Sequence, residues 1–345
     1  MDERGRTDVD PAVGAPRPLT SATVRVPCST SNLGAGFDCI GLALDLHLEI
    51  SFKPGASEFA VVREGTLADL AVPPEEDLAA TAFLRAVRGA GAVPSGVLTM
   101  RSEIPVGKGL GASAAATVAG FDLGLAACGF DTDRGAILAL GMEREGHGDN
   151  VAPILLGGLV AVVPKTGESA AERRGETETF GVAVLELSPE IGFAFAAPAR
   201  PLSTREARKA LPNEVSHATA VRSAARAVAL TRGLETGDPM LLRAAVEGEE
   251  LHTSHRLPLI EGGEAALRAG YAAGAWAVTT SGAGSGMIAM CEPMDADEIA
   301  EAMRRAFAAT VSRDEARLCI GFALRPEPTG VRRLAGVGRM TGVGA

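Results

Sequence analysis

Apolar and polar positions alternate along the chain at two different spacings, and the two spacings predict different elements. Short apolar runs bounded by glycine, proline or polar residues indicate strands. Such runs lie at 22–26, 42–52, 97–102, 158–163, 182–187, 193–197, 276–280, 287–291 and 316–324. Apolar residues three and four positions apart indicate helices. These patterns lie at 77–89, 112–127, 133–143, 203–230 (broken near Pro212), 239–252 and 295–308.

The order of these elements predicts an α+β fold in two parts. Each half of the chain runs strand, strand, helix, strand, which is typical of helices layered on a sheet. A length of 345 residues corresponds to about two domains, at roughly 100–200 residues each. The polar stretch 165–179 is the best boundary between them. Residues 1–20 are rich in Asp, Arg, Pro and Gly without periodicity, which predicts a disordered extension.

The composition excludes several classes of protein. Acidic residues outnumber basic ones by 43 to 33, and no run of Lys or Arg suggests a basic groove. We therefore expect neither nucleic acid nor a membrane as a partner. Five cysteines without a CxxC pair indicate reduced thiols. No apolar run reaches the ~18 residues of a membrane span, and the N-terminus lacks an apolar signal core, so the expected location is the cytoplasm.

The segment 104–116 is the strongest candidate for binding chemistry. It places Gly107, Lys108, Gly109 and Gly111 before a predicted helix that opens near Ser113. Backbone amides at the start of such a helix bind phosphate. No Gly-Lys-Ser or Gly-Lys-Thr occurs in the chain, and no acidic residue stands about 20 positions on at a strand end. The loop is therefore neither a Walker A loop nor a dinucleotide fingerprint, and a plain glycine turn is an equal alternative.

Three further segments change this balance. Glycine-serine loops at 27–38 and 281–286 also join predicted elements, and 145–153 reads Glu-Gly-His-Gly-Asp-Asn-Val-Ala-Pro. Together with the loop at 104–116 they resemble the motifs of the GHMP kinases, the superfamily that includes galactokinase, homoserine kinase and mevalonate kinase. Within it, 27–38 and 145–153 are most similar to motifs of homoserine kinases. The resemblance runs from about 23 to 332, with the four motifs in the family's order.

This resemblance implies a fold and a reaction. The fold would have two domains, each a mixed or antiparallel sheet layered with helices: an ATP-binding domain at 21–165 and a ferredoxin-like domain at 180–345. The reaction would be ATP-dependent phosphorylation of the L-homoserine hydroxyl to O-phospho-L-homoserine, in threonine biosynthesis. ATP and Mg²⁺ would be required, and the family suggests a homodimer.

The resemblance also implies a nucleotide site. Its residues would be Pro105, Val106, Gly107, Lys108, Gly109, Leu110, Gly111, Ala112, Ser113, Ala114, Ala115, Ser281, Gly282, Ala283 and Gly284. Ser113 and Glu145 would hold Mg²⁺, which prefers oxygen ligands. Glu143 is a second candidate, although a solvated helix end is the better interpretation of that residue. The adenine contacts are expected to be apolar and to lie within 61–92.

On the substrate side, the residues should match an amino acid with a hydroxyl. Asp38 would take the ammonium, and Arg208 and Arg256 would clamp the carboxylate. Asn32, His147 and Asn150 would surround the hydroxyl end. Asn150, Lys108 and Ser113 are the candidates for catalysis. Some relatives have an aspartate that could act as the base, whereas homoserine kinases have asparagine in that region, which Asn150 matches here. We therefore expect no strong general base.

Two departures from the family pattern bear on the substrate. Ala112 stands where relatives commonly have a first serine, and Gly148 stands where they have proline. Two other functions therefore stay open. One is a different GHMP kinase, acting on shikimate, a mevalonate-type alcohol or a sugar. The other is a non-catalytic sensor of an amino acid or nucleotide.

Overall fold

The computed structural model describes residues 18–56, 58–164 and 180–334. The extension predicted at 1–20, apart from residues 18–20, lies outside the described residues. So does the polar boundary predicted at 165–179. Among the described residues, no helix is long and apolar enough to cross a membrane.

The first sheet has seven strands and is mixed. Its strands are β1 (Ala22–Asn32), β2 (Gly36–Pro54), β3 (Ala60–Gly65), β4 (Gly96–Ser102), β5 (Leu159–Pro164), β6 (Phe180–Leu185) and β11 (Arg332–Leu334). The main path runs β11-β1-β2-β4-β3, and β5 pairs with both β2 and β6. Only the β3–β4 pair is parallel among these described strands. The fold-class prediction of mixed or antiparallel sheets with helices is confirmed.

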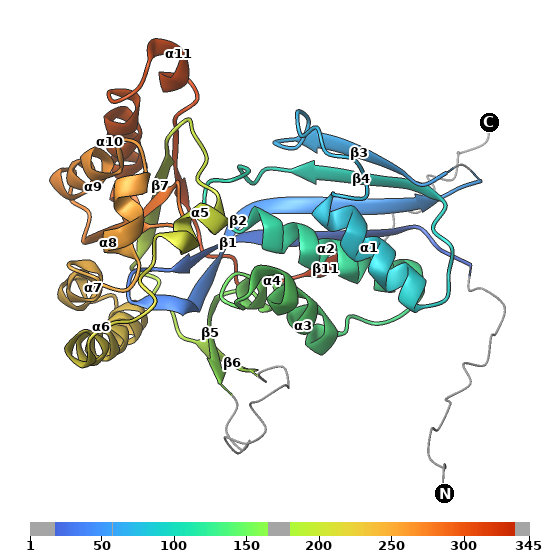
Figure 1. Ribbon diagram of the computed structural model, residues 1–345, viewed down its shortest axis with the longest axis horizontal. Coiled ribbons are helices and arrows are strands. Elements are labelled where there is room, and N and C mark those ends of the chain that lie inside the picture. Colours follow the sequence, from blue (N-terminus) through green and yellow to red (C-terminus); the bar gives the residue numbers. More distant parts are fainter. Residues whose placement is uncertain (1–17, 57, 165–179, 335–345) are drawn as a thin grey trace, which may run out of the picture.

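Four helices of the described residues pack on this half of the molecule. They are α1 (Leu78–Gly89), α2 (Ala112–Ala127), α3 (Arg134–Glu145) and α4 (Val151–Leu156). Figure 1 shows α1 and α2 side by side along one face of the sheet. A Cβ at Gly120 of α2 would lie 2.2 Å from the Ala79 carbonyl oxygen, so the two helices can approach closely only with glycine there. Phe83 of α1 contacts Phe52 of β2, with ring centroids 4.7 Å apart.

The second sheet is a four-stranded antiparallel one with the order β10-β7-β9-β8. Its strands are β7 (Gly192–Ala197), β8 (Ala277–Thr280), β9 (Met287–Cys291) and β10 (Ile320–Leu324). The helices of this half are α5 (Thr204–Lys209), α6 (His217–Thr236), α7 (Pro239–Val246), α8 (Thr253–Arg256), α9 (Gly263–Ala272), α10 (Ala296–Ala308) and α11 (Arg313–Ala316). Every residue of β7 is buried, which explains its unbroken apolar sequence.

The predicted elements are found with a few differences. The helix expected at 203–230 is two helices, α5 and α6, because the chain is irregular from 210 to 216 around Pro212. The strand expected from 316 starts at 320, since α11 occupies the preceding residues. Six α-helices and strands of the described chain were not predicted: β3, α4, α8, α9, α11 and β11. Helix α9 fully buries only Gly263, Ala266 and Gly270, and its larger residues Leu267 and Tyr271 are partly buried, so its apolar pattern is weak.

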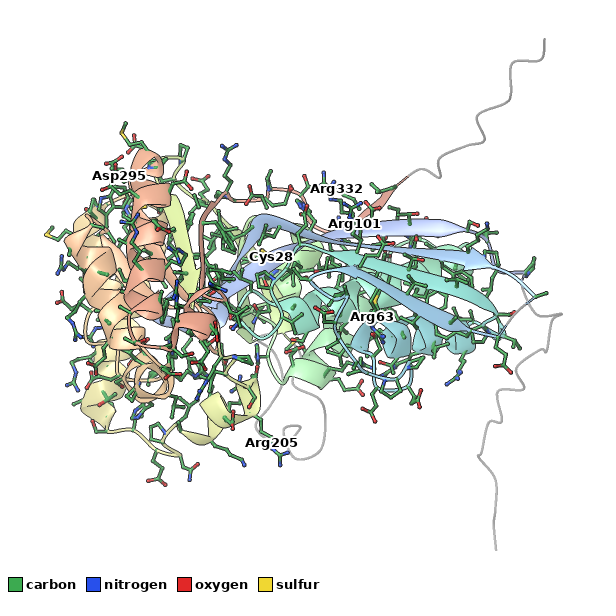
Figure 2. The ribbon with its side chains drawn as sticks, turned by 90° about the horizontal axis from the view of Figure 1, so that it is seen from above. Cys28, Arg63, Arg101, Arg205, Asp295 and Arg332 are labelled. Atoms are coloured by element: carbon green, nitrogen blue, oxygen red, sulfur yellow. The ribbon has the colours of Figure 1, made fainter. Side chains whose placement is uncertain are left out.

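The two halves meet where their glycine-serine loops contact one another. Cys28, which lies in β1 where the first predicted loop segment begins, is at this junction in Figure 2. The Thr30 and Ser281 hydroxyls are 2.9 Å apart, and the amide of Gly282 donates to the Ser31 carbonyl at 3.1 Å. The amide of Gly286 donates to the Lys108 carbonyl at 3.1 Å. Segments about 80 to 250 residues apart in the chain thus form one surface between the sheets.

Candidate functional site

A cavity of about 450 Å³ opens at this junction and gathers most of the predicted site residues. Those that line it are residues 105–113 and 282–284, with Asn32, Asp38, Glu145, His147, Asn150, Arg208 and Arg256. Ala114, Ala115 and Ser281 are fully buried and do not line it. The four sequence segments therefore converge on one space, although they come from different elements.

The glycine loop presents the start of α2 to this cavity. Gly111 precedes the helix at φ 65°, and no side chain of the described residues caps the first turn. A Cβ at Gly111 would lie 2.3 Å from the Ser29 hydroxyl, and one at Gly109 would lie 2.0 Å from the Ser281 carbonyl oxygen. Only glycine fits these positions. The uncapped amides and the helix dipole make the loop a binding site for an anion.

Lys108 is held by the second half of the molecule. Its ammonium donates to the carbonyls of Pro198 and Ala199, at 2.7 and 2.6 Å, just after β7 ends. Burial lowers the pKa of this lysine from its usual value. The sequence predicted a phosphate contact for Lys108, whereas here its charge is shared with two backbone carbonyls at the cavity wall.

Two of the predicted residues bring oxygen-bearing side chains to the cavity and could hold a divalent cation. Ser113 is the second residue of α2 and Glu145 is the last residue of α3, and both line the cavity. Glu143 does not line it, and its carboxylate accepts two hydrogen bonds from the exposed Arg85, at 3.1 and 3.0 Å. A hydroxyl and a carboxylate fit Mg²⁺, which takes few protein oxygens and keeps several waters.

A second group of possible ligands comprises Asp38, His147 and Asp149, whose ligand atoms lie within 4.8 Å of one another. Most of these groups already have partners, although one Asp149 oxygen has none among the described residues. Asp38 is bound by Arg208, and Nδ1 of His147 contacts Asp149. The adjacent guanidinium also opposes a cation there, so this cluster fits an organic substrate better than a metal.

Asn32 and Asp38 are placed by an unusual backbone. Both adopt left-handed conformations, with φ 72° and 54°, which non-glycine residues seldom do. The Asn32 amide donates to the Gly282 carbonyl at 2.8 Å, and its oxygen accepts from the amide of Asp38 at 2.9 Å. Asn32 therefore links the first loop to the third and fixes Asp38.

Arg208 and Arg256 bring positive charge to the same end of the cavity. Arg208, on α5, binds both oxygens of Asp38 at 2.9 Å, and this hydrogen bonding raises the pKa of the guanidinium. Arg256 is 2% exposed, and burial lowers its pKa. It donates to the Gly282 carbonyl at 3.3 Å, but its Nε has no partner among the described residues. A buried guanidinium with an unused donor beside a cavity favours an anionic ligand.

Asn150 and His147 also line the cavity. The Asn150 oxygen accepts from Ser29 and its amide donates to Ser31, both at 2.9 Å, so its orientation is fixed. Burial alone would lower the pKa of His147, but the hydrogen bond to Asp149 and the charges of Asp149 and Asp38 raise it overall.

The sequence did not single out the remaining lining residues. An apolar part of the cavity is formed by Leu67, Leu70, Val72, Leu78 and Met100. Of these, all but Met100 lie in the range 61–92 that was expected to contact adenine. Ser203 and Thr204 also line the cavity. Their position at the start of α5, shortly before Arg208, was the only feature of the sequence that could have indicated them.

Comparison with known proteins is consistent with this geometry. The model for the GHMP kinases N terminal domain matches residues 77–158, and the model for the GHMP kinases C terminal matches residues 228–309. The chain is similar to the homoserine kinase of Gloeobacter violaceus, with 37% identity over 292 residues, covering 83% of this chain and 92% of that protein. The homoserine kinase of Synechococcus sp. (strain RCC307) is 34% identical over 299 residues, covering 86% and 92%.

Solved structures show the same fold. The crystal structure of homoserine kinase from Cytophaga hutchinsonii has a TM-score of 0.74 at 24% identity, covering 91% of this chain and 97% of that one. L. major mevalonate kinase, in complex with R-mevalonate, has a TM-score of 0.62 at 13% identity, covering 90% and 98%. The two-sheet arrangement is thus common to kinases that are named for different substrates.

Proposed function

We propose that this chain, which belongs to the homoserine kinase family of the GHMP kinases, transfers the γ-phosphoryl group of ATP to the hydroxyl of L-homoserine. One observation carries the proposal. A single cavity has an anion-binding loop with oxygen ligands at one end and paired opposite charges at the other. The first end suits the phosphates of a nucleotide, and the second suits the carboxylate and ammonium of an amino acid. The product would be O-phospho-L-homoserine, a precursor in threonine biosynthesis.

The nucleotide would be bound mainly through backbone groups. The amides around Gly109 to Ser113 would hold the phosphates, and the apolar wall around Leu70 and Val72 would receive the adenine. Lys108 would add positive charge from its position against the Pro198 carbonyl. Gly282 to Gly284 would close the site from the second half.

Ser113 and Glu145 would hold Mg²⁺. When bound, the ion would neutralise charge that develops on the phosphate oxygens during transfer. The ion pair between Glu143 and Arg85, outside the cavity, supports the choice of Glu145 over Glu143.

The amino acid would lie between the two arginines and Asp38. The unused Nε of Arg256 and the N–H donors of Arg208 that Asp38 does not engage would bind the carboxylate. Asp38 would accept the ammonium, and Asn32, His147 and Asn150 would orient the hydroxyl toward the phosphates. A buried guanidinium and a partly exposed one beside a carboxylate suit a zwitterion, and this favours homoserine over shikimate, mevalonate or a sugar.

Phosphoryl transfer would depend on alignment rather than on a strong base. The hydroxyl oxygen would form the new bond to phosphorus while the bond to the departing ADP oxygen breaks, and the hydroxyl proton would pass to solvent. Asn150 cannot accept that proton, and both ends of its amide are occupied by Ser29 and Ser31. Its role would be to position the hydroxyl.

A coupled assay of ADP release tests the proposal. Turnover with L-homoserine should exceed that with shikimate or mevalonate by several orders of magnitude. A preference for either of the other alcohols would instead assign a different GHMP kinase activity. Tight ATP binding without turnover of any alcohol would identify a non-catalytic sensor.

The setting of the enzyme is also part of the proposal. All five cysteines are free thiols, which supports a reducing compartment such as the cytoplasm. Nothing in the charge of −10 favours nucleic acid or an anionic membrane as partner. A homodimer is proposed on the family resemblance alone.

A further inference from the structure

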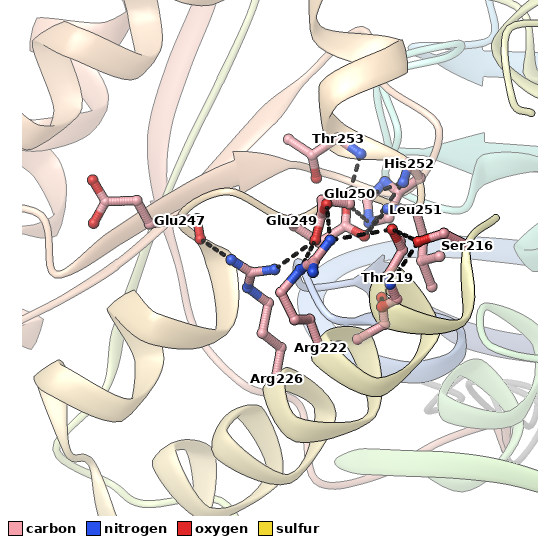
Figure 3. A network of polar contacts seen from close by, with 11 residues as sticks. Ser216, Thr219, Arg222, Arg226, Glu247, Glu249, Glu250, Leu251, His252 and Thr253 are labelled. Atoms are coloured by element: carbon pink, nitrogen blue, oxygen red, sulfur yellow. Dashed lines mark hydrogen bonds and ion pairs between the residues drawn. The ribbon is translucent and has the colours of Figure 1, made fainter.

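A buried carboxylate lies close to the proposed substrate site without lining the cavity. Glu249, in the turn between α7 and α8, is 4% exposed. Its carboxylate accepts hydrogen bonds from the amides of Leu251, His252 and Thr253, at 2.5, 3.0 and 2.7 Å (Figure 3). These amides begin the four-residue helix α8, which ends at Arg256. Glu249 therefore fixes the short element that carries the buried arginine.

His252 extends this arrangement to the other side of the site. It is fully buried, and its Nε2 lies 2.8 Å from the Gly34 carbonyl. Because a carbonyl oxygen only accepts, Nε2 must carry the hydrogen. Nδ1 then has no hydrogen, and it has no partner in the part of the chain that the structure describes. The hydrogen bond of the imidazole is thus with the loop that holds Asn32 and Asp38, and its Nε2 also lies 3.6 Å from the Glu249 carboxylate.

Phe37 joins the two sides directly. Its ring stacks on His252 with centroids 5.0 Å apart and an interplanar angle of 19°. The Arg256 guanidinium lies 5.1 Å from the centroid of the same ring. Phe37 immediately precedes Asp38, so a shift of the imidazole would move both the arginine and the carboxylate.

Next to Glu249, the side chain of Glu250 forms ion pairs at the surface of the molecule. Glu250 accepts from Arg222 of α6 at 2.7 Å and from Arg226 at 3.3 Å, and these side chains are partly exposed (Figure 3). Such surface ion pairs contribute little, typically about 0–1 kcal/mol. A buried carboxylate beside a buried imidazole is costly unless its hydrogen bonds are satisfied.

We propose that Glu249 and His252 are positioning residues that set the distance between Arg256 and Asp38, and so determine the affinity for the amino-acid substrate without contacting it. This inference rests on the proposed function of the cavity. It predicts that the two residues affect the amino-acid end of the site and leave the nucleotide end unchanged, because among the described residues no hydrogen bond joins either of them to the glycine loop.

Steady-state kinetics on the full chain test the proposal through separate KM values. His252→Ala should raise the KM for L-homoserine by about 10–100-fold, the scale expected for a displacement of roughly 1 Å. The KM for ATP should change by less than about twofold. His252→Gln places an amide donor where Nε2 lies, so it should restore most of the affinity. His255→Gln, in the same short helix, should resemble the wild type and serves as the control.

A merely structural role would give a different pattern. In that case, His252→Ala would lower the unfolding temperature and raise both KM values in parallel, or would leave the KM for L-homoserine unchanged; either result overturns the proposal. Should His252→Ala not fold, Phe37→Leu tests the same link and should raise the KM for L-homoserine alone. Absence of turnover in the wild type would reject the proposed function. Wild-type turnover with no selective effect in the variants would reject this inference only.

Discussion

Arg208 and Asp38 lie 170 residues apart in the sequence and form a bidentate ion pair at one end of the cavity, with both N–O distances at 2.9 Å. The fork of the guanidinium matches the two carboxylate oxygens, which a lysine cannot do. Arg208→Lys should therefore raise the KM for L-homoserine and lower kcat/KM by roughly 10–100-fold, because one point charge replaces two directed hydrogen bonds. Initial rates at varied L-homoserine concentration measure this effect.

Arg205 provides a matched control for that substitution. It lies one turn earlier on α5, is exposed, and points away from the body of the molecule in Figure 2. Arg205→Lys should leave both KM values unchanged. Equal losses in the two variants would show that α5 responds to any change of arginine and would remove Arg208 from the substrate site.

Glu145 and Glu143 stand two positions apart at the end of α3 and should differ sharply in their dependence on Mg²⁺. Glu145→Gln removes a charged oxygen from the cavity and should raise the Mg²⁺ concentration for half-maximal activity by about tenfold or more. Glu143→Gln breaks only an exposed pair with Arg85, so its Mg²⁺ titration should overlay that of the wild type. The opposite ranking of the two variants would assign the ligand role to Glu143.

Ser113 supplies the hydroxyl at the start of α2. Ser113→Ala should reduce kcat by roughly 10²–10³-fold, the scale for losing one group that stabilises the transition state. An effect below a few-fold would remove Ser113 from the site. Ala112→Ser is the informative companion, since Ala112 lines the same cavity but lacks a hydroxyl. Restoring that hydroxyl should change kcat by no more than a few-fold, because the backbone amide already serves the phosphates.

Asn150 tests whether the reaction needs a base. Asn150→Asp would replace the amide that now donates to Ser31 with a carboxylate, and would add negative charge near the phosphates. We expect kcat to fall by about tenfold or more, with no new acidic limb in its pH profile. Higher activity governed by an acidic pKa would show that a carboxylate base is useful here and would contradict catalysis by alignment alone.

Much of the site could be predicted because its residues stand in local motifs. Gly109 and Gly111 could be placed because the loop must leave amides free, and Asp38 could be placed because its motif resembled a known one. The order of apolar runs likewise predicted most strands of both sheets. These features depend on residues that are close in the sequence.

The remainder depends on contacts between distant segments, which no local pattern records. Lys108 resembles a phosphate ligand in its loop, yet its ammonium meets carbonyls 90 and 91 residues away. Glu249 fell within a helix expected at 239–252, where an acidic residue ordinarily faces solvent. The structure ends α7 at Val246 and turns Glu249 inward toward the amides of α8. Short strands such as β11 likewise became identifiable only through their pairing with β1.

The buried imidazole of His252 should make the stability of the protein depend on pH. Burial lowers the pKa of His252 below its ordinary value of 6.5, although Glu249, Asp38 and the Gly34 carbonyl oppose this and Arg256 adds to it. Below about pH 6.5 the unfolded chain binds a proton at this residue that the folded chain does not. The contribution of His252 to the free energy of unfolding is therefore fully present above pH 6.5. It is lost as the pH falls below 6.5, by on the order of 1 kcal/mol per pH unit. Burial alone would raise the pKa of Glu249, but the charge of His252 and the hydrogen bonds from three amides lower it overall. Glu249 therefore adds a similar loss of unfolding free energy, but only as the pH falls below its ordinary pKa of 4.5.

Thermal or denaturant unfolding at pH 7.5 and 5.5 separates the contribution of His252 from the destabilisation that acid causes through other groups. The loss of unfolding free energy between the two values should be smaller in His252→Gln than in the wild type, because glutamine does not titrate. His255→Gln should lose as much as the wild type. If His252→Gln and the wild type lose the same amount, His252 must bind its proton equally well in the folded and unfolded chains. Burial would then not disfavour the charged imidazole, which would contradict the lowered pKa of His252.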